Sequence, residues 1–498
     1  MPGINQLAKD TLIYGISVVL NPLVQTFVLL RLLTSKLDTY DYGTYTYFYA
    51  AAGVLLILFS MRMETTYFRM AGEAPEEKVY ANAWRTVIIF SSFLSLVLLV
   101  GADLVADFFE DPAFSRYTIY LAAILWLDAF IAIPFARLRH QERSLKFSLL
   151  KIGNVLLTLI IILVYLLVLP DWKASFPEEW QVYISEPYWL DGIFMANLLA
   201  SFLLALYFSS EASVLFKKGN DPALLKRILV YTAPLILIGL AGNANQLLDR
   251  LLMPFLTGNT VAEGMSNTGV YGGATKVAAI MLLFTKAFNY AFDPYIFKRY
   301  AQDKDTGVYA RIAHYFTIVS GVIFVGAVGF SFLLEHLLGS EQFREGMRYV
   351  PVLLLAYFMV GIYYHFSIWY KLRDRTHYGA VIALLGVIVT LLCNIWLVPH
   401  LGLYGAPVAM IVNFGFMSAL CVLWGRRFLQ VDYRFGRMVA HLFLSIGFVY
   451  FFVNWWQPVH PEWWWGPLLF VVYLLMVLVL ERESLRRVRK LLFDNKFK

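Results

Sequence analysis

Residues 378–424 read YGAVIALLGVIVTLLCNIWLVPHLGLYGAPVAMIVNFGFMSALCVLW, without one Lys, Arg, Asp or Glu. A helix needs about 20 mostly apolar residues to cross a bilayer. The stretch therefore accommodates two crossing helices, 378–398 and 402–424, and it predicts an α-helical membrane protein.

The rest of the chain has the same character. Of its 498 residues, 60% are hydrophobic and only 15% are charged, whereas soluble domains carry about 25% charged residues. The mean hydropathy of +0.64 also excludes a disordered chain, a coiled coil, collagen and a secreted disulfide scaffold. Stretches of spanning length predict about fourteen transmembrane helices, at 11–33, 44–61, 82–106, 117–137, 147–169, 192–210, 228–253, 268–291, 309–334, 349–371, 378–398, 402–424, 438–455 and 465–480.

The basic residues predict the orientation. Cytoplasmic loops are rich in Lys and Arg. With a cytoplasmic N-terminus, most of the basic loop residues fall inside, and the outer loops hold only Lys36, Arg116, Lys173, Arg344 and Arg348. We therefore expect both termini in the cytoplasm. We also expect the basic tail from Glu481 to lie along the inner leaflet and contact membrane lipids.

Several functions are excluded at this stage. The net charge of +7 is spread over short loops, so the chain is not expected to bind nucleic acid. Cys393 and Cys421 lie in apolar runs and predict neither a disulfide nor a metal site. Nucleotide-binding, metalloprotease and hydrolase motifs are missing. We therefore expect no catalytic residues, no metal ligands and no organic cofactor; any energy source would be a gradient of H⁺, Na⁺ or the substrate.

Two segments of the sequence resemble each other. Gly43-Thr44-Tyr45 follows a span ending in Arg31-Leu32-Leu33, and Gly269-Val270-Tyr271 follows a span containing Arg250-Leu251-Leu252. An even number of helices per copy would give parallel repeats, as in some transporters. The prediction is an N-terminal six-helix lobe, a cytoplasmic linker, a C-terminal six-helix lobe, two extra helices and a tail, at 1–210, 211–227, 228–424, 425–480 and 481–498.

Apart from those counted with the cytoplasmic loops, four basic residues fall inside predicted spans. A charge at the bilayer centre costs about 2.5–3.5 kcal/mol even on insertion scales, so a cavity or a partner is needed. One hypothesis is an electropositive cavity for an anionic head group, lined by Arg31, Arg250, Lys276 and Lys286, with Asn243, Gln246 and Asp249 as its polar neighbours. The alternative is structural: Asp249 pairs with Arg250, the amides join helices, and Arg31 and Lys286 extend to the membrane surfaces.

Asp128 is the acid nearest the middle of a predicted span. Ionisable residues at this depth often carry protons or bind ions in transporters. The residue is therefore a candidate for ion coupling, although it could equally neutralise one of the cavity cations.

Short motifs along almost the whole chain resemble the polysaccharide-transporter branch of the MOP exporter superfamily, which contains lipid-linked oligosaccharide flippases. Their order and spacing carry the resemblance. The motifs are Leu7–Gly15, Tyr42-Gly43-Thr44-Tyr45, Met63–Arg69, Pro134–Arg139, Asp249-Arg250, Gly269-Val270-Tyr271 with Lys276, Asp293–Arg299, Asn394–Pro399 and Gly402–Ala406.

The resemblance implies two six-helix bundles arranged as a V, followed by a C-terminal hairpin, with alternating access to a central cavity. It implies export of a polyprenyl-pyrophosphate-linked oligosaccharide, such as an O-antigen, capsule or exopolysaccharide repeat unit, across a bacterial inner membrane. Glycan polymerase and glycosyltransferases would be its partners. Three alternatives remain: a peptidoglycan-precursor flippase, an ion-coupled multidrug antiporter of the same superfamily, and a scaffold for glycan synthesis.

Overall fold

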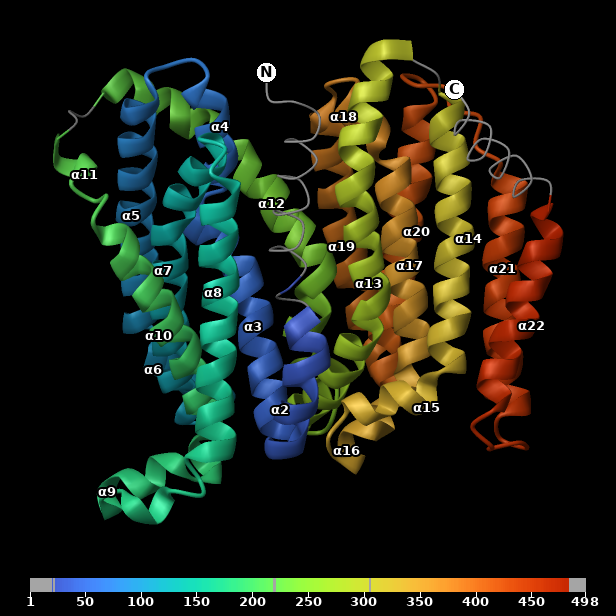
Figure 1. Ribbon diagram of the computed structural model, residues 1–498, viewed down its shortest axis with the longest axis horizontal. Coiled ribbons are helices and arrows are strands. Elements are labelled where there is room, and N and C mark those ends of the chain that lie inside the picture. The colour runs from blue at the N-terminus through green and yellow to red at the C-terminus, as the bar shows by residue number, and fades with distance from the viewer. Residues whose placement is uncertain (1–19, 21–22, 218–220, 304–305, 483–498) are drawn as a thin grey trace. The chain divides into compact units, whose positions relative to one another are not determined.

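The computed structural model describes residue 20 and the ranges 23–217, 221–303 and 306–482 (Figure 1). Every regular element in these ranges is a helix. The motif Leu7–Gly15, most of the predicted span 11–33, and the basic tail beyond residue 482 lie outside the described residues. The all-α class is confirmed for the rest of the chain.

The chain forms two compact units. The first unit comprises the described residues of 1–273 and 379–413, and the second unit those of 274–378 and 414–498. The α-helices before residue 257 are α2 (Leu30–Lys36), α3 (Thr39–Ser60), α4 (Met63–Ala71), α5 (Glu76–Val100), α6 (Ala102–Phe109), α7 (Ala113–His140), α8 (Ser144–Leu163), α9 (Glu178–Gln181), α10 (Trp189–Ser209), α11 (Val214–Lys217) and α12 (Pro222–Leu256). The later ones are α13 (Val261–Asp303), α14 (Gly307–Gly329), α15 (Ser331–Leu334), α16 (Glu341–Arg344), α17 (Val350–Phe366), α18 (Ile368–Leu372), α19 (Thr376–Leu401), α20 (Gly405–Gly425), α21 (Phe435–Phe451) and α22 (Trp465–Leu480).

The helices are long enough for a multi-span membrane protein. Eleven segments of the described chain have the length and apolarity of a membrane span. One of them, Thr376–Gly425, contains both α19 and α20, and α22 is a shorter apolar helix. Each predicted span from 44–61 onward contains a helix of the structure. The total of fourteen and the division into two six-helix lobes stay predictions.

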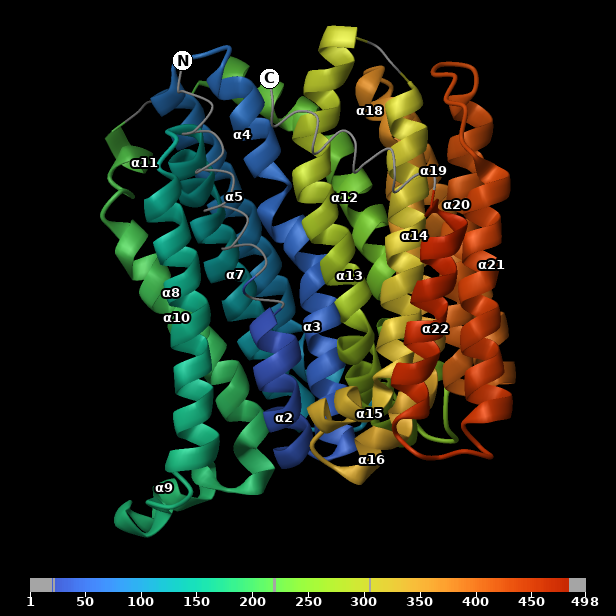
Figure 2. The same cartoon turned by 45° about the vertical axis from the view of Figure 1, so that its right-hand side comes forward.

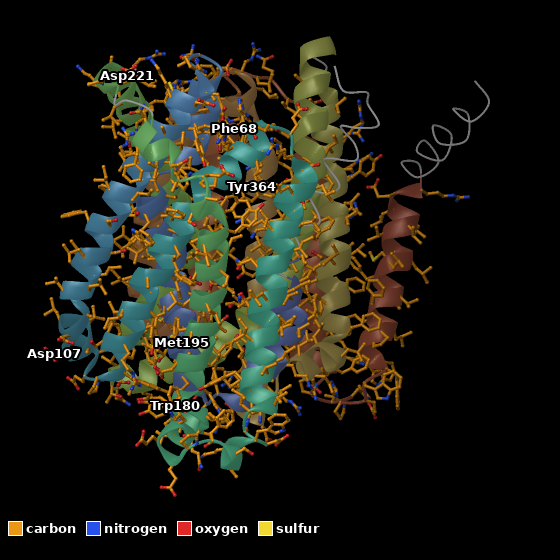
Figure 3. The ribbon with its side chains drawn as sticks, turned by 60° about the vertical axis from the view of Figure 1, so that its left-hand side comes forward. Phe68, Asp107, Trp180, Met195, Asp221 and Tyr364 are labelled. Carbon is orange, nitrogen blue, oxygen red and sulfur yellow. The ribbon has the colours of Figure 1, made fainter. Side chains whose placement is uncertain are left out.

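Local sequence signals explain where α3 begins and ends and where α12 begins. The Asp38 carboxylate accepts a hydrogen bond from the backbone N–H of Asp41 at 2.8 Å and caps the start of α3. Met61 and Arg62 then adopt left-handed φ angles of 54° and 51°, which separate α3 from α4. Asp221 caps α12 in the same way, through the N–H of Leu224, at the end of the first unit opposite Trp180 (Figure 3).

Helix α7 is the centre of the first unit. It packs against α3, α5, α6 and α10. Ala122, Ala129 and Ala136 recur every seven residues along it and are fully buried. Small residues allow close approach of helices where lipid offers no hydrophobic driving force, so α7 can carry a polar side chain inside the unit.

Helix α14 is central to the second unit, as α7 is to the first. It packs against α17, α21 and α22, and Figure 2 shows α22 beside α14 and α21. A Cβ atom built on Gly466 of α22 would lie 2.0 Å from the carbonyl oxygen of Gly329. The backbones of α14 and α22 therefore touch at this end of the hairpin formed by α21 and α22.

The two repeat motifs meet each other within the first unit. A Cβ atom on Gly43 of α3 would lie 1.9 Å from the carbonyl oxygen of Met265. A Cβ atom on Gly269 of α13 would lie 2.0 Å from the carbonyl oxygen of Thr39. The backbones of α3 and α13 therefore cross in close contact at these two glycines.

We expect Gly269→Ala to lower the free energy of unfolding by about 1–3 kcal/mol or more, because the backbones at this crossing must separate. The measurement is the midpoint of thermal unfolding in detergent. The matched control is Gly153→Ala on α8, where an added Cβ meets nothing within 4 Å. Equal midpoints for the two variants would contradict the close crossing.

Candidate functional site

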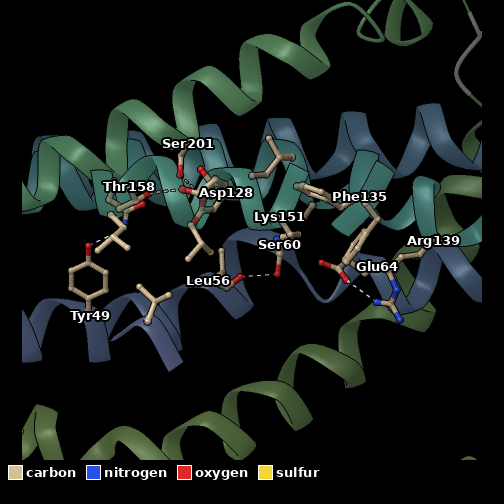
Figure 4. A pocket seen from close by; sticks show the side chains of 18 of the residues that line it. Tyr49, Leu56, Ser60, Glu64, Asp128, Phe135, Arg139, Lys151, Thr158 and Ser201 are labelled. Atoms are coloured by element: carbon tan, nitrogen blue, oxygen red, sulfur yellow. Dashed lines mark hydrogen bonds and ion pairs between the residues drawn. The ribbon is translucent and has the colours of Figure 1, made fainter. Parts of the chain in front are cut away.

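A cavity of about 580 Å³ lies inside the first unit. Its walls come from α3, α4, α7, α8 and α10, together with Val24 and Leu29. Figure 4 shows the side chains that face it. Its charged and hydrogen-bonding lining includes Tyr49, Glu64, Asp128, Arg139, Lys151 and Asn197. Its volume is that of a small-ligand site.

Asp128 faces the middle of this cavity (Figure 4). It is half-buried on α7, and its carboxylate accepts a hydrogen bond from the Ser201 hydroxyl of α10 at 3.0 Å. Lys151 of α8 interacts with it electrostatically. The acid singled out from the sequence thus has a cavity, a hydrogen-bond donor and a basic neighbour.

Lys151 was missed as a site residue because it lies near the start of the predicted span 147–169 and was counted with the cytoplasmic loop residues. The structure places it two turns inside α8, with its ammonium 4.4 Å from the ring centre of Phe135. The signal was present in the sequence: Lys151, Asn154 and Thr158 follow one another at i, i+3 and i+7 and line the same cavity. Asn243, Gln246 and Arg250 of α12 have the same spacing.

The two ends of the cavity differ in their polar groups. At one end, Arg139 lies 4.0 Å from Glu64 and 5.2 Å from the ring centre of Phe68. Toward the other end, the Asn197 amide donates to the Tyr49 hydroxyl at 2.8 Å. The lining therefore holds two acids and two bases, a composition suited to binding or releasing a small cation.

The structure places Arg250 in a pair with the neighbouring acid. Its guanidinium lies 3.3 Å from the Asp249 carboxylate and donates to the carbonyl oxygen of Gln246 at 2.7 Å. The other carboxylate oxygen of Asp249 accepts a hydrogen bond from Tyr271 at 2.7 Å. Arg250 is 9% exposed and Asp249 is 3% exposed. The pairing of Arg250 with Asp249 is the structural alternative considered in the sequence analysis. A role for Arg250 in binding substrate stays a prediction.

The remaining predicted cations are distributed over the two units. Arg31 lies exposed on α2 of the first unit. Lys276 is half-buried and Lys286 is exposed, both on the part of α13 that belongs to the second unit. Asn243 donates to the carbonyl oxygen of Gly53 at 2.5 Å and joins α12 to α3. A cavity shared by these cations stays a prediction.

A buried amide cluster in the first unit had not been identified from the sequence as one site. The Asn245 side-chain oxygen accepts hydrogen bonds from Thr390 at 3.2 Å and Asn413 at 3.1 Å. The amide oxygens of Asn394 and Asn413 are buried without a hydrogen-bond partner in the described chain. Carbonyl oxygens are ligands that hard cations prefer, so this cluster is the second place in the first unit where a small cation could be held.

The helices have a fold of the MOP type, as comparison with solved structures shows. Similar folds include the lipid II flippase MurJ in an inward closed conformation, at 11% identity and a TM-score of 0.67, covering 95% of this chain and 100% of the flippase chain. A multidrug resistance MATE family transporter of the MOP superfamily in an inward-facing conformation matches at 13% identity and a TM-score of 0.60, covering 86% and 98%. The Vibrio cholerae MATE transporter VcmN in the bent form matches at 14% identity and a TM-score of 0.51, covering 86% and 98%.

The chain belongs to the polysaccharide biosynthesis protein family, whose model matches residues 7–289. A search of curated proteins found no match. The chain is therefore a polysaccharide biosynthesis protein with a MOP-like fold and several candidate membrane spans. The resemblance noted in the sequence is confirmed.

Proposed function

We propose that the protein moves a polyprenyl-pyrophosphate-linked oligosaccharide across the bacterial inner membrane by alternating access. The family match over residues 7–289 is the observation that carries this proposal. The solved structure with a similar fold is named a lipid II flippase. Its name supports a lipid-linked rather than a free glycan as the substrate here. The two-lobe, fourteen-span arrangement with both termini in the cytoplasm is part of the proposal, as is cooperation with glycosyltransferases and a glycan polymerase.

The cavity in the first unit supports a proposal about the source of energy. Asp128 can bind a proton or Na⁺, and the basic neighbour Lys151 can replace that ion when it leaves. A half-buried acid that alternates between an ion and Lys151 as its partner would give the first unit two electrostatic states. We therefore propose that an ion gradient drives export through Asp128.

The pyrophosphate would be held by basic residues. Lys276 is the candidate of choice because it is half-buried within α13, whereas Arg31 and Lys286 are exposed. A hydrogen bond to a charged group contributes about 1.5–3 kcal/mol, which corresponds to a change in affinity of roughly tenfold or more.

Lys276→Ala is expected to lower the apparent affinity for the lipid-linked substrate at least tenfold, because the phosphate loses a charged donor. The protein should remain in the membrane in normal amounts. Lys276→Arg should retain most transport, and Lys226→Ala, at an exposed position on α12, is the control. Normal substrate affinity in Lys276→Ala would remove this residue from the phosphate site.

The function itself is tested in proteoliposomes that contain the purified protein and a fluorescent polyprenyl-pyrophosphate oligosaccharide. A glycosidase added outside reports which leaflet holds the sugar. Protein-dependent exchange between leaflets, accelerated by an H⁺ or Na⁺ gradient, supports the proposal. Movement of lipid II alone would favour the peptidoglycan-precursor alternative, efflux of cationic drugs alone the antiporter alternative, and no movement of any of them the scaffold alternative.

A further inference from the structure

Two histidines and a glutamate converge at one end of the second unit. His314 comes from α14, His441 from α21, and Glu481 directly follows α22. Glu481 is separated from His314 by 167 residues in the sequence and from His441 by 40. No local spacing could reveal such a set, so the sequence analysis found no metal-ligand motif.

The three side chains share one point in space. The Nε2 atoms of His314 and His441 lie 3.2 Å and 3.0 Å from the same oxygen, Oε1 of Glu481. One ligand atom from each residue lies within 4.8 Å of those of the other two. All three residues are buried, at 2%, 5% and 6% exposure.

Two of the three separations between ligand atoms are compatible with a tetrahedral metal ion. Zinc binds histidine nitrogen and carboxylate oxygen at about 2.0–2.2 Å. Two ligands at that radius in a tetrahedron stand about 3.3 Å apart, close to the two measured separations. A buried carboxylate beside two imidazoles also favours a cation, because burial of its charge is costly unless that charge is compensated.

We propose that His314, His441 and Glu481 bind a divalent transition metal ion of the Zn²⁺ class. Imidazole nitrogen together with one carboxylate is a donor set that suits Zn²⁺. Because His314 lies on α14, His441 on α21 and Glu481 at the end of α22, the bound ion would fasten the hairpin of α21 and α22 to α14. The ion has a structural role in holding the hairpin, and the transport proposal is independent of it.

The proposal is tested on the full chain, purified without a histidine tag and stripped with a chelator. Dialysis against Zn²⁺ is followed by measurement of metal per protein by mass spectrometry, and Co²⁺ serves as a spectroscopic probe of tetrahedral geometry. One Zn²⁺ per chain is expected, together with a higher midpoint of thermal unfolding in the presence of Zn²⁺ than in its absence.

His441→Gln and Glu481→Gln should lower the Zn²⁺ affinity at least about tenfold, since even loss of an outer-shell partner of a metal ligand costs about 10–100-fold. Both variants should also lose the thermal response to Zn²⁺. His400→Gln, at an exposed position on α19, should bind Zn²⁺ like the unaltered protein. Absence of Zn²⁺ from the unaltered protein after dialysis, or equal affinity in His441→Gln, overturns the site and leaves two histidines hydrogen-bonded to Glu481.

Discussion

Asp128→Asn is expected to abolish the contribution of an ion gradient to transport while leaving slow exchange between the leaflets. A potential of about 100 mV contributes roughly 2.3 kcal/mol for each charge moved. Loss of one coupled charge should therefore lower substrate accumulation roughly 40-fold at that potential. The measurement is glycosidase-accessible substrate in proteoliposomes with and without imposed H⁺ and Na⁺ gradients.

Two controls separate coupling from a general loss of structure. Asp107→Asn removes an exposed acid on α6 and should transport like the unaltered protein. Ser201→Ala removes only the hydroxyl that donates to Asp128, and should weaken gradient-driven transport less than Asp128→Asn does. An Asp128→Asn protein with the full response to both gradients would reject the coupling role.

Arg250→Ala is expected to lower the free energy of unfolding by about 3–5 kcal/mol, the usual effect of removing one partner from a buried ion pair. The Asp249 carboxylate, 3% exposed, would remain charged inside the first unit with Tyr271 as its side-chain donor. The midpoint of thermal unfolding in detergent measures this loss, and less protein should accumulate in the membrane.

The double variant Asp249→Asn/Arg250→Gln decides between the two roles weighed for Arg250. Because it removes both charges, it should recover most of the lost stability. If Arg250 acts only within the pair, the double variant also recovers transport; if Arg250 binds the pyrophosphate, it is stable but inactive. A single Arg250→Ala variant as stable as the unaltered protein would contradict the importance of the ion pair itself.

The helices could be predicted from the sequence more completely than the residues of the candidate site. The helix α3 was predicted as 44–61 and is Thr39–Ser60 in the structure, since about 20 apolar residues with a capping Asp38 ahead of them are a local signal. Asp128 was recognised for its depth in α7. Lys151 was not, because it lies near the start of the predicted span 147–169, where a basic side chain is expected at the membrane surface.

No local pattern in the sequence could have shown that the other site residues lie close together. Asn245, Thr390 and Asn413 are spread over three helices, and their hydrogen bonds exist only because α12, α19 and α20 are packed in the first unit. The same holds for His314 and Glu481. Conversely, Arg250 was predicted with two alternatives, and the position of the Asp249 carboxylate supports the structural one.

The sequence by itself determined that this protein is a bundle of membrane-spanning helices, because the free energy of placing a residue in lipid depends on that residue and its near neighbours. Only the tertiary structure decided which polar groups share a cavity, which charges are paired and which imidazoles meet a carboxylate. Those outcomes depend on how helices that are distant in the chain pack against one another. In lipid, hydropathy does not drive this packing; the shapes of the helix surfaces and the close approach of their backbones do.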